Sequence, residues 1–247
     1  MHGALGDYRQ WSALAGPLRS RFRVVAISRR YHWPNPPPGA DDVYTYERHC
    51  DDLLAAVKAG GRRVHLVGHS YGAGVVLLAA LREPDRIETL TLVEPPFASL
   101  LPAAAPGLEE EISSRAAMVE RVQALARQGH EREAGQLLIE WTQGGPPAFS
   151  MLPAAVRRGF EDNARTAGPT YGSIPPSITR EDSSRLRVRT LIMTGEHTRL
   201  YFRLIAASAA ASIPGAAATR VGSARHMVIV ERPVETAERI LEFLLND

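Results

Sequence analysis

The feature that most restricts the fold is a serine between two glycines, at the junction of a predicted strand and a predicted helix. The apolar run Val64–Val67 predicts a strand, and Ala73–Arg82 predicts a buried helix. Between them lies the G-x-S-x-G motif Gly68-His69-Ser70-Tyr71-Gly72. A tight turn of this kind exposes the serine hydroxyl, and its glycines let neighbouring backbone pass without a Cβ clash. We therefore expect a nucleophile at Ser70; the alternative is a serine that only caps the helix.

Short apolar runs alternate with longer helical patterns along the rest of the chain. The apolar positions from Tyr46 to Val57 recur at helical spacing, and Gly60-Gly61 predicts the end of that helix. Strand–helix–strand alternation favours an α/β fold, with a mostly parallel sheet and helices on both of its faces. The other predicted strands are Phe22–Ile27, which we expect to be buried, Ile87–Val93, Val188–Thr194 and Thr219–Val221, and the other predicted helices are Leu200–Ser212 and an amphipathic one from Val234 to Leu244.

The alternation stops between residues 97 and 185. Helices are predicted near Leu108–Gln128, Glu131–Thr142 and Pro153–Thr166, with no strand pattern between them. A helical insertion between two strands is typical of a lid, because ligands bind at the carboxyl ends of such strands. We expect an α/β core formed by residues 1–96 and 186–247 and a helical cap formed by residues 97–185. The alternative is a helical subdomain with a packing role only.

Composition excludes several other classes of protein. The 247 residues carry 29 basic and 27 acidic side chains, and no basic stripe is interleaved with aromatics, so we expect no nucleic-acid partner. The single cysteine, Cys50, cannot form an intrachain disulfide or a cysteine-based zinc cluster. No apolar run approaches the roughly 18 residues that cross a bilayer, and the first residues do not resemble a signal peptide. We therefore expect a cytoplasmic protein without membrane insertion.

Several segments resemble the α/β-hydrolase fold family, and the resemblance covers nearly the whole chain. His2-Gly3-Ala4 resembles the oxyanion loop of the family, and Ser70 matches its nucleophile. Ser223-Ala224-Arg225-His226-Met227 resembles the histidine loop that precedes its last helix. The resemblance implies a serine hydrolase in which His226 is the base. It also implies an oxyanion hole formed by the backbone N–H groups of Ala4 and Tyr71.

The acid of the triad departs from the commonest pattern of the family. That pattern has an aspartate three residues after the glycine that ends the strand Val188–Thr194, where this chain has Thr198. A second arrangement, similar to that of zearalenone-lactonase-like members, has the acid at the end of the strand beside the nucleophile strand, which here is Glu94. Because neighbouring strands lie about 4.8 Å apart, a carboxylate there can reach a histidine above Ser70. We expect Glu94 to be the acid, with Glu196 as the alternative.

These residues together predict a cofactor-free serine hydrolase that cleaves a carboxylic ester or lactone through an acyl-enzyme. Nothing in the sequence indicates a metal, a nucleotide or a flavin. Apolar side chains near the predicted lid favour a small, moderately apolar substrate, and the candidates for the pocket are Trp33, Trp141, Phe149, Met151 and Phe160. Two alternatives stay open, because fold alone does not choose between chemistries: a lyase or cyclase with the same triad, and a catalytically weak protein that binds a small molecule.

The resemblance also leads to an expectation about the start of the chain. In the family, the oxyanion loop follows a central strand that lies between the strand matching Phe22–Ile27 and the nucleophile strand, whereas here Met1 directly precedes His2. A gap in the sheet would leave backbone groups unpaired, at about 1–3 kcal/mol each if buried. We therefore expect this fold without its N-terminal strands, and a native reading frame that begins some tens of residues upstream, unless Phe22–Ile27 pairs with the nucleophile strand.

Overall fold

A parallel sheet positions the residues of interest. The computed structural model describes residues 1–39, 41–172 and 178–246. Within these ranges the sheet has four parallel strands in the order β1-β2-β3-β4. The strands are β1 (Val64–His69), β2 (Ile87–Val93), β3 (Arg189–Gly195) and β4 (Ala217–Val221). The register pairs His69 with Val93 and Val93 with Met193, so the carboxyl ends of β1, β2 and β3 lie level and the residues that follow them come together.

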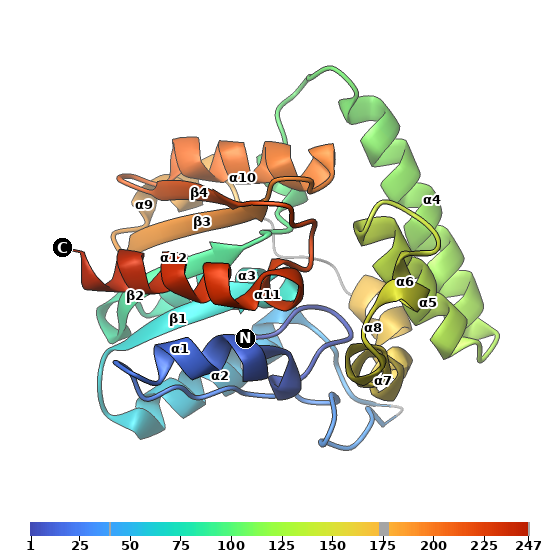
Figure 1. Ribbon diagram of the computed structural model, residues 1–247, viewed down its shortest axis with the longest axis horizontal. Helices are drawn as coiled ribbons and strands as arrows, with labels where there is room; N and C mark the ends of the chain where they lie inside the picture. Colours follow the sequence, from blue (N-terminus) through green and yellow to red (C-terminus); the bar gives the residue numbers. More distant parts are fainter. Residues whose placement is uncertain (40, 173–177, 247) are drawn as a thin grey trace.

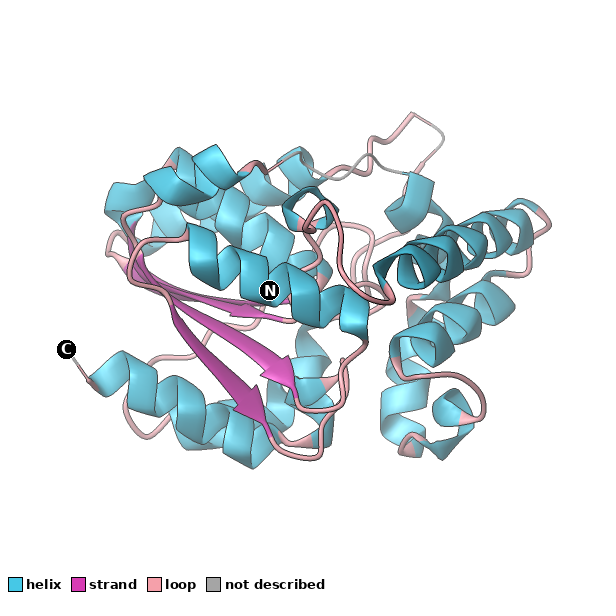
Figure 2. Cartoon of the chain, turned by 90° about the horizontal axis from the view of Figure 1, so that it is seen from above, coloured by secondary structure: helices cyan, strands magenta, loops and turns pink. Residues whose placement is uncertain are grey.

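Helices cover both faces of the sheet (Figures 1 and 2). Side chains alternate between the faces along each strand, so Leu92 and Ile192 belong to one buried apolar cluster, and Val93 and Met193 to another. The first cluster is completed by α2 (Tyr46–Gly60), α3 (Tyr71–Arg82) and α10 (Leu200–Ser212), and the second by α1 (Ser12–Leu18) and α12 (Pro233–Leu245). Short helices complete the α/β part of the chain: η1 (Tyr8–Trp11), η2 (Pro84–Arg86) and α11 (Val228–Glu231). The predicted α/β architecture is confirmed.

The ends of α2 follow the local chemistry of its sequence. The Thr45 side chain accepts a hydrogen bond from the Arg48 N–H and caps the first turn. Gly61 adopts a left-handed conformation with φ 65° and ends the helix, as the Gly60-Gly61 pair predicted. The apolar face between these ends packs on α3, which carries Ser70 at its N-terminus.

The chain between β2 and β3 is helical in its described residues, and α4 to α8 lie beside one end of the sheet (Figure 1). Its elements are η3 (Ala98–Leu100), α4 (Leu108–Arg127), α5 (Glu131–Thr142), α6 (Ala148–Met151), α7 (Ala154–Asp162), η4 (Ala164–Thr166), α8 (Ala167–Gly172) and α9 (Arg180–Arg185). The three helices predicted here correspond to α4, to α5 and to α7 with η4. None of the described helices combines the length and the apolar character that crossing a bilayer requires.

The strand predicted at Phe22–Ile27 is wrong. The segment lies outside the sheet, and Val25 is 68% exposed. A β-branched run becomes a strand only when a neighbour accepts its backbone hydrogen bonds, and in the described residues β1 is flanked on that side by Met1 instead. The Met1 amino group donates to the Val67 carbonyl at 2.6 Å, and the His69 N–H donates to the Met1 carbonyl at 3.0 Å.

Candidate active site

Ser70 occupies the sharp turn between β1 and α3. Its backbone has φ 51° and ψ −121°, a strained conformation for a residue with a side chain, held by the elements on either side. A Cβ on Gly68 would lie 2.4 Å from the Gly72 carbonyl oxygen, and a Cβ on Gly72 would lie 2.2 Å from that of Met1. Both glycines are therefore required by close backbone approach, as the motif predicted.

His226 lies in the loop between β4 and α11 and faces Ser70. Its Nε2 is 3.0 Å from Ser70 Oγ, and the residue is 4% exposed. The ring of Phe202 packs against the imidazole with 4.0 Å between centroids. His69 Nε2–H donates to the backbone carbonyl of His226 at 2.8 Å. These two contacts fix the imidazole over the serine.

Glu94 directly follows β2, and its side chain is fully buried. Carboxylate oxygen Oε2 lies 3.0 Å from His226 Nδ1 and accepts a hydrogen bond from Thr198 Oγ1 at 2.7 Å. The other oxygen, Oε1, accepts from the Gly195 N–H at 2.7 Å. Since three donors surround it, the carboxylate has partners in place of water. A continuous hydrogen-bonded chain thus connects Glu94, His226 and Ser70.

Glu196, the alternative acid, points elsewhere. Its side chain is 54% exposed, accepts from the Ser223 N–H at 2.9 Å and lies 3.9 Å from His197 Nε2. Thr198, which stands where the commoner pattern has an aspartate, binds Glu94 through its hydroxyl. The structure therefore brings Glu94, and not Glu196, into contact with His226.

Burial determines the charge state of the imidazole. Removal from water lowers the pKa of His226 well below 6.5, because the charged form loses its hydration. The neutral ring can hold its proton on Nδ1, facing the Glu94 carboxylate, and present the Nε2 lone pair to Ser70. This is the arrangement that a general base requires.

The first residues of the chain form a turn beside Ser70. The Gly6 N–H donates to the Gly3 carbonyl at 3.2 Å, and Leu5 has φ 56°. Because a trans peptide is planar, the Ala4 N–H points away from the Gly3 carbonyl. Ala4 also lines the same cavity as Ser70. Tyr71 directly follows Ser70 and is the first residue of α3.

Arg29 is a residue of this region that the sequence did not reveal. It is 2% exposed, and its Nη2 donates to the Gly3 carbonyl at 2.9 Å while Nη1 donates to Tyr44 Oη at 2.8 Å. The guanidinium also lies 4.1 Å from the centroid of the Tyr71 ring. His2 accepts from the Arg29 N–H through Nε2 at 2.9 Å. Arg29 therefore ties the turn at Gly3 to the helix that begins after Ser70.

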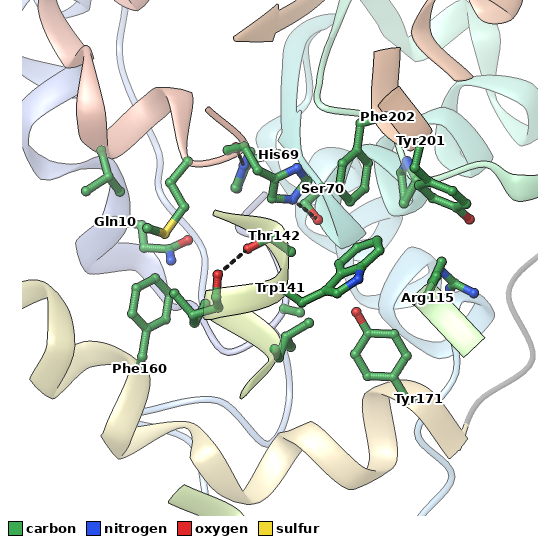
Figure 3. Close-up of a pocket in the computed structure, with 17 residues that line it drawn as sticks. Gln10, His69, Ser70, Arg115, Trp141, Thr142, Phe160, Tyr171, Tyr201 and Phe202 are labelled. Carbon is green, nitrogen blue, oxygen red and sulfur yellow. Dashed lines mark hydrogen bonds between the residues drawn. The ribbon is translucent and has the colours of Figure 1, made fainter. Parts of the chain in front are cut away.

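A cavity of about 60 Å³ opens beside Ser70 and His226 (Figure 3). Trp141 and Phe160, both predicted pocket residues, line it, and so do Phe202 and Met227. Its wall is mostly apolar and comes from the helices between β2 and β3, the loops after the strands, the first ten residues of the chain, and α10 and α11. Within the described ranges, no three His, Cys, Asp or Glu side chains are grouped closely enough to hold a metal ion.

Three predicted pocket residues lie outside the cavity lining. Trp33 packs on the surface, 3.9 Å beneath the Arg9 guanidinium. Met151 is 77% exposed, and Phe149 packs against the edge of the main apolar cluster. A large apolar side chain near a lid can lie on its outer surface or pack inside it instead of facing the cavity. The prediction is therefore wrong for these three residues.

The prediction from sequence also missed a charged residue of the cavity lining. Arg115 lies on the stripe of α4 whose other members, Met118, Val122 and Leu125, are buried apolar residues. An arginine at an apolar position of a helical pattern is the signal that could have identified it. Tyr171 and Tyr201 lie next to it.

Comparison with known proteins gives three findings. A family model described as "Alpha/beta hydrolase family" matches residues 1–239. The chain is similar to the carboxylesterase YbfK of Bacillus subtilis (strain 168), with 24% identity over 254 residues that cover 99% of this chain and 78% of the relative. Its structure resembles a hydrolase from Pseudomonas aeruginosa PA01 (25% identity, TM-score 0.76, covering 99% and 88% of the two chains) and an alpha/beta hydrolase from Sphaerobacter thermophilus DSM 20745 (27% identity, TM-score 0.72, covering 98% and 90%).

Proposed function

Because this chain belongs to the alpha/beta hydrolase family, we propose that it is a serine hydrolase that cleaves a carboxylic ester or lactone through an acyl-enzyme intermediate. One observation carries the proposal: the chain of hydrogen bonds from Glu94 through His226 to Ser70, with 3.0 Å at each of its two links. The carboxylesterase relative supports the choice of an ester.

In the first half of the proposed reaction, Ser70 Oγ forms a bond to the acyl carbon of the substrate. His226 Nε2 takes the hydroxyl proton, and Glu94 stabilises the imidazolium that forms. The tetrahedral intermediate then collapses: the bond to the leaving oxygen breaks, and His226 gives that oxygen the proton. Water repeats the sequence on the acyl-enzyme, releases the acid and restores Ser70.

The negative oxygen of the intermediate needs donors that are already in position. We assign this role to the backbone N–H groups of Ala4 and Tyr71. The turn from Gly3 to Gly6 supports the assignment of Ala4. The Gly3 carbonyl, which belongs to the same peptide as the Ala4 N–H, accepts hydrogen bonds from Arg29 and from the Gly6 N–H. The position of Tyr71 at the start of α3 supports the other donor, because the positive end of a helix favours an anion.

We further assign residues 97–185 as a helical cap on a core of residues 1–96 and 186–247. Support comes from the cavity lining, to which α4, α5, α7 and α8 contribute Arg115, Trp141, Phe160 and Tyr171. A lid in this position excludes water from the reacting atoms and limits the size of the substrate.

Labelling and turnover test the function together. A fluorophosphonate probe should label the wild-type protein and the Ser20→Ala control, which removes an exposed hydroxyl, but not Ser70→Ala. The same two active proteins should hydrolyse members of a panel of short-chain esters and lactones. Labelling of Ser70→Ala at the wild-type rate would refute the assignment of the nucleophile. Labelling at Ser70 with binding but no turnover across the panel would favour a binding protein instead.

A further inference from the structure

One end of the cavity beside Ser70 carries a positive charge. Arg115 is half-buried, and its guanidinium carbon lies 5.3 Å from the ring of Tyr201 and 6.0 Å from that of Tyr171. Figure 3 shows the three side chains on the same side of the pocket, next to Trp141. Arg115 comes from the apolar stripe of α4 and so is directed inward rather than into solvent.

No acid neutralises this charge among the residues that the structure describes. Glu111, one helical turn before Arg115, is bound by Arg199, with 3.0 Å and 3.1 Å between its oxygens and the guanidinium nitrogens. Glu94 is enclosed behind His226, and the described lining of the cavity contains no aspartate or glutamate. A guanidinium that faces a largely apolar cavity without a carboxylate partner is ready to bind an anion.

The hydroxyl of Tyr201 is a second, independent sign of a missing ligand. Tyr201 is 2% exposed and lines the cavity, yet its Oη has no hydrogen-bond partner within the described chain. Buried polar atoms are nearly always paired, because an unpaired one loses its bonds to water without replacement. A ligand oxygen between Arg115 and Tyr201 would supply the partner for both.

We propose that the substrate of this site carries a carboxylate, which Arg115 and the Tyr201 hydroxyl bind while Ser70 attacks an ester bond of the same molecule. The proposal rests on the proposed hydrolase function and specifies its substrate class. A carboxylate fits because the guanidinium fork presents two parallel N–H donors to its two oxygens. Substrates of this class include the monoester of a small dicarboxylic acid and a lactone with one acid group.

A matched pair of substrates tests the charge alone. Monomethyl glutarate and the methyl ester of glutaramic acid have the same length. The first ends in a carboxylate and the second in an uncharged amide. We expect wild-type kcat/KM to be about 10- to 100-fold higher for the charged ester. Arg115→Gln should remove this preference by lowering kcat/KM for the charged ester more than for the amide ester, and Tyr201→Phe should reduce the preference by about tenfold. Arg121→Gln, which removes an exposed arginine of the same helix, should keep the preference.

Two outcomes would overturn the proposal. A wild-type enzyme that hydrolyses both esters equally has no anion site, and an Arg115→Gln variant that loses activity on both equally reveals a structural role only. Fluorophosphonate labelling separates this proposal from the function itself. Glutarate should slow labelling of Ser70 in the wild type but not in Arg115→Gln, whereas glutaramide, the uncharged diamide, should slow labelling of neither protein. Labelling that glutarate never slows refutes the anion site alone, and absence of labelling refutes the hydrolase.

Discussion

Arg29 donates a hydrogen bond to the carbonyl oxygen of Gly3 over 2.9 Å, from a side chain that is only 2% exposed. A buried guanidinium is costly, and within the described residues Arg29 has no carboxylate partner; its contacts are the Gly3 carbonyl, the Tyr44 hydroxyl and the Tyr71 ring. Its bond to Gly3 fixes the plane of the peptide that also carries the Ala4 N–H. Arg29 thus orients a proposed oxyanion donor without facing the substrate.

Replacing Arg29 should therefore affect the transition state more than substrate binding. We expect Arg29→Met to lower kcat about 10- to 100-fold with KM changed less than about threefold, and Arg29→Lys to lose less. Steady-state kinetics on a neutral ester gives both values, and Arg30→Gln, which breaks a half-exposed pair with Asp52, serves as control. Circular dichroism verifies the fold of each variant. A lower melting temperature of Arg29→Met with unchanged kcat would show that Arg29 only stabilises the fold.

Ser70 and His226 should behave as one catalytic unit. Each of Ser70→Ala and His226→Ala is expected to remove nearly all turnover, because the proton transfer needs both groups. The double variant should then be little worse than either single variant. Rate constants for the three proteins on one activated ester decide the point: additive losses would mean that the two residues do not share a step.

Glu94 and Glu196 should differ sharply on substitution. We expect Glu94→Gln to lower kcat about 10³- to 10⁴-fold, since the amide cannot stabilise the imidazolium, and Glu196→Gln to stay near wild type. The expectation follows from the buried contact of Glu94 with His226 and the exposed position of Glu196. Full activity in Glu94→Gln would assign the acid elsewhere.

An acid restored at position 198 should partly rescue that loss. The Thr198 hydroxyl already touches Glu94 Oε2 at 2.7 Å, so a carboxylate there is close to the same edge of the imidazole. We expect Thr198→Asp combined with Glu94→Gln to regain part of the activity. The comparison with Thr198→Asn in the same background isolates the charge, and equal activity of the two double variants would contradict the prediction.

Activity should be lost on acidification only at a pH below the usual pKa of a histidine side chain. Burial lowers the pKa of His226 below 6.5, and imidazolium cannot accept the Ser70 proton, so activity is lost as pH falls through that pKa. The pH profile of kcat/KM for a neutral ester should have its acid midpoint below pH 6.5. A midpoint above 6.5 would show that the charged ring is stabilised in the free enzyme.

Much of the fold was predictable because its signals are local. Ile87–Val93 and Leu200–Ser212 match β2 and α10 residue for residue, since apolar periodicity and strand-forming residues determine them directly. Phe22–Ile27 carries the same local signal but has no strand neighbour among the described residues to pair with. A strand depends on its partner, and periodicity says nothing about partners.

The candidate site was predictable where residues follow strand ends. Ser70 and Glu94 each follow a parallel strand, and this predicted that they lie close together. In the structure the carboxyl ends of β1 and β2 are level, which brings the two residues together. Arg29 and Tyr201 escaped prediction because their importance depends on the folded structure: Arg29 binds a carbonyl of a distant segment, and the Tyr201 hydroxyl is buried without a partner among the described residues. The predicted pocket lining failed for Trp33, Phe149 and Met151 because an apolar side chain near a lid can pack away from the cavity.

Thr198 and Glu94 are 104 residues apart in sequence and meet at one carboxylate oxygen. This meeting restricts how the proposed acid could be exchanged between the two strand ends by single substitutions. An ancestor that gained an aspartate in place of Thr198 while it kept Glu94 would hold two carboxylates against one ring, and one of them would have to take up a proton. An ancestor that lost Glu94 first would have no acid at all. Either order of substitution therefore passes through a protein with one carboxylate too many or too few beside the His226 ring.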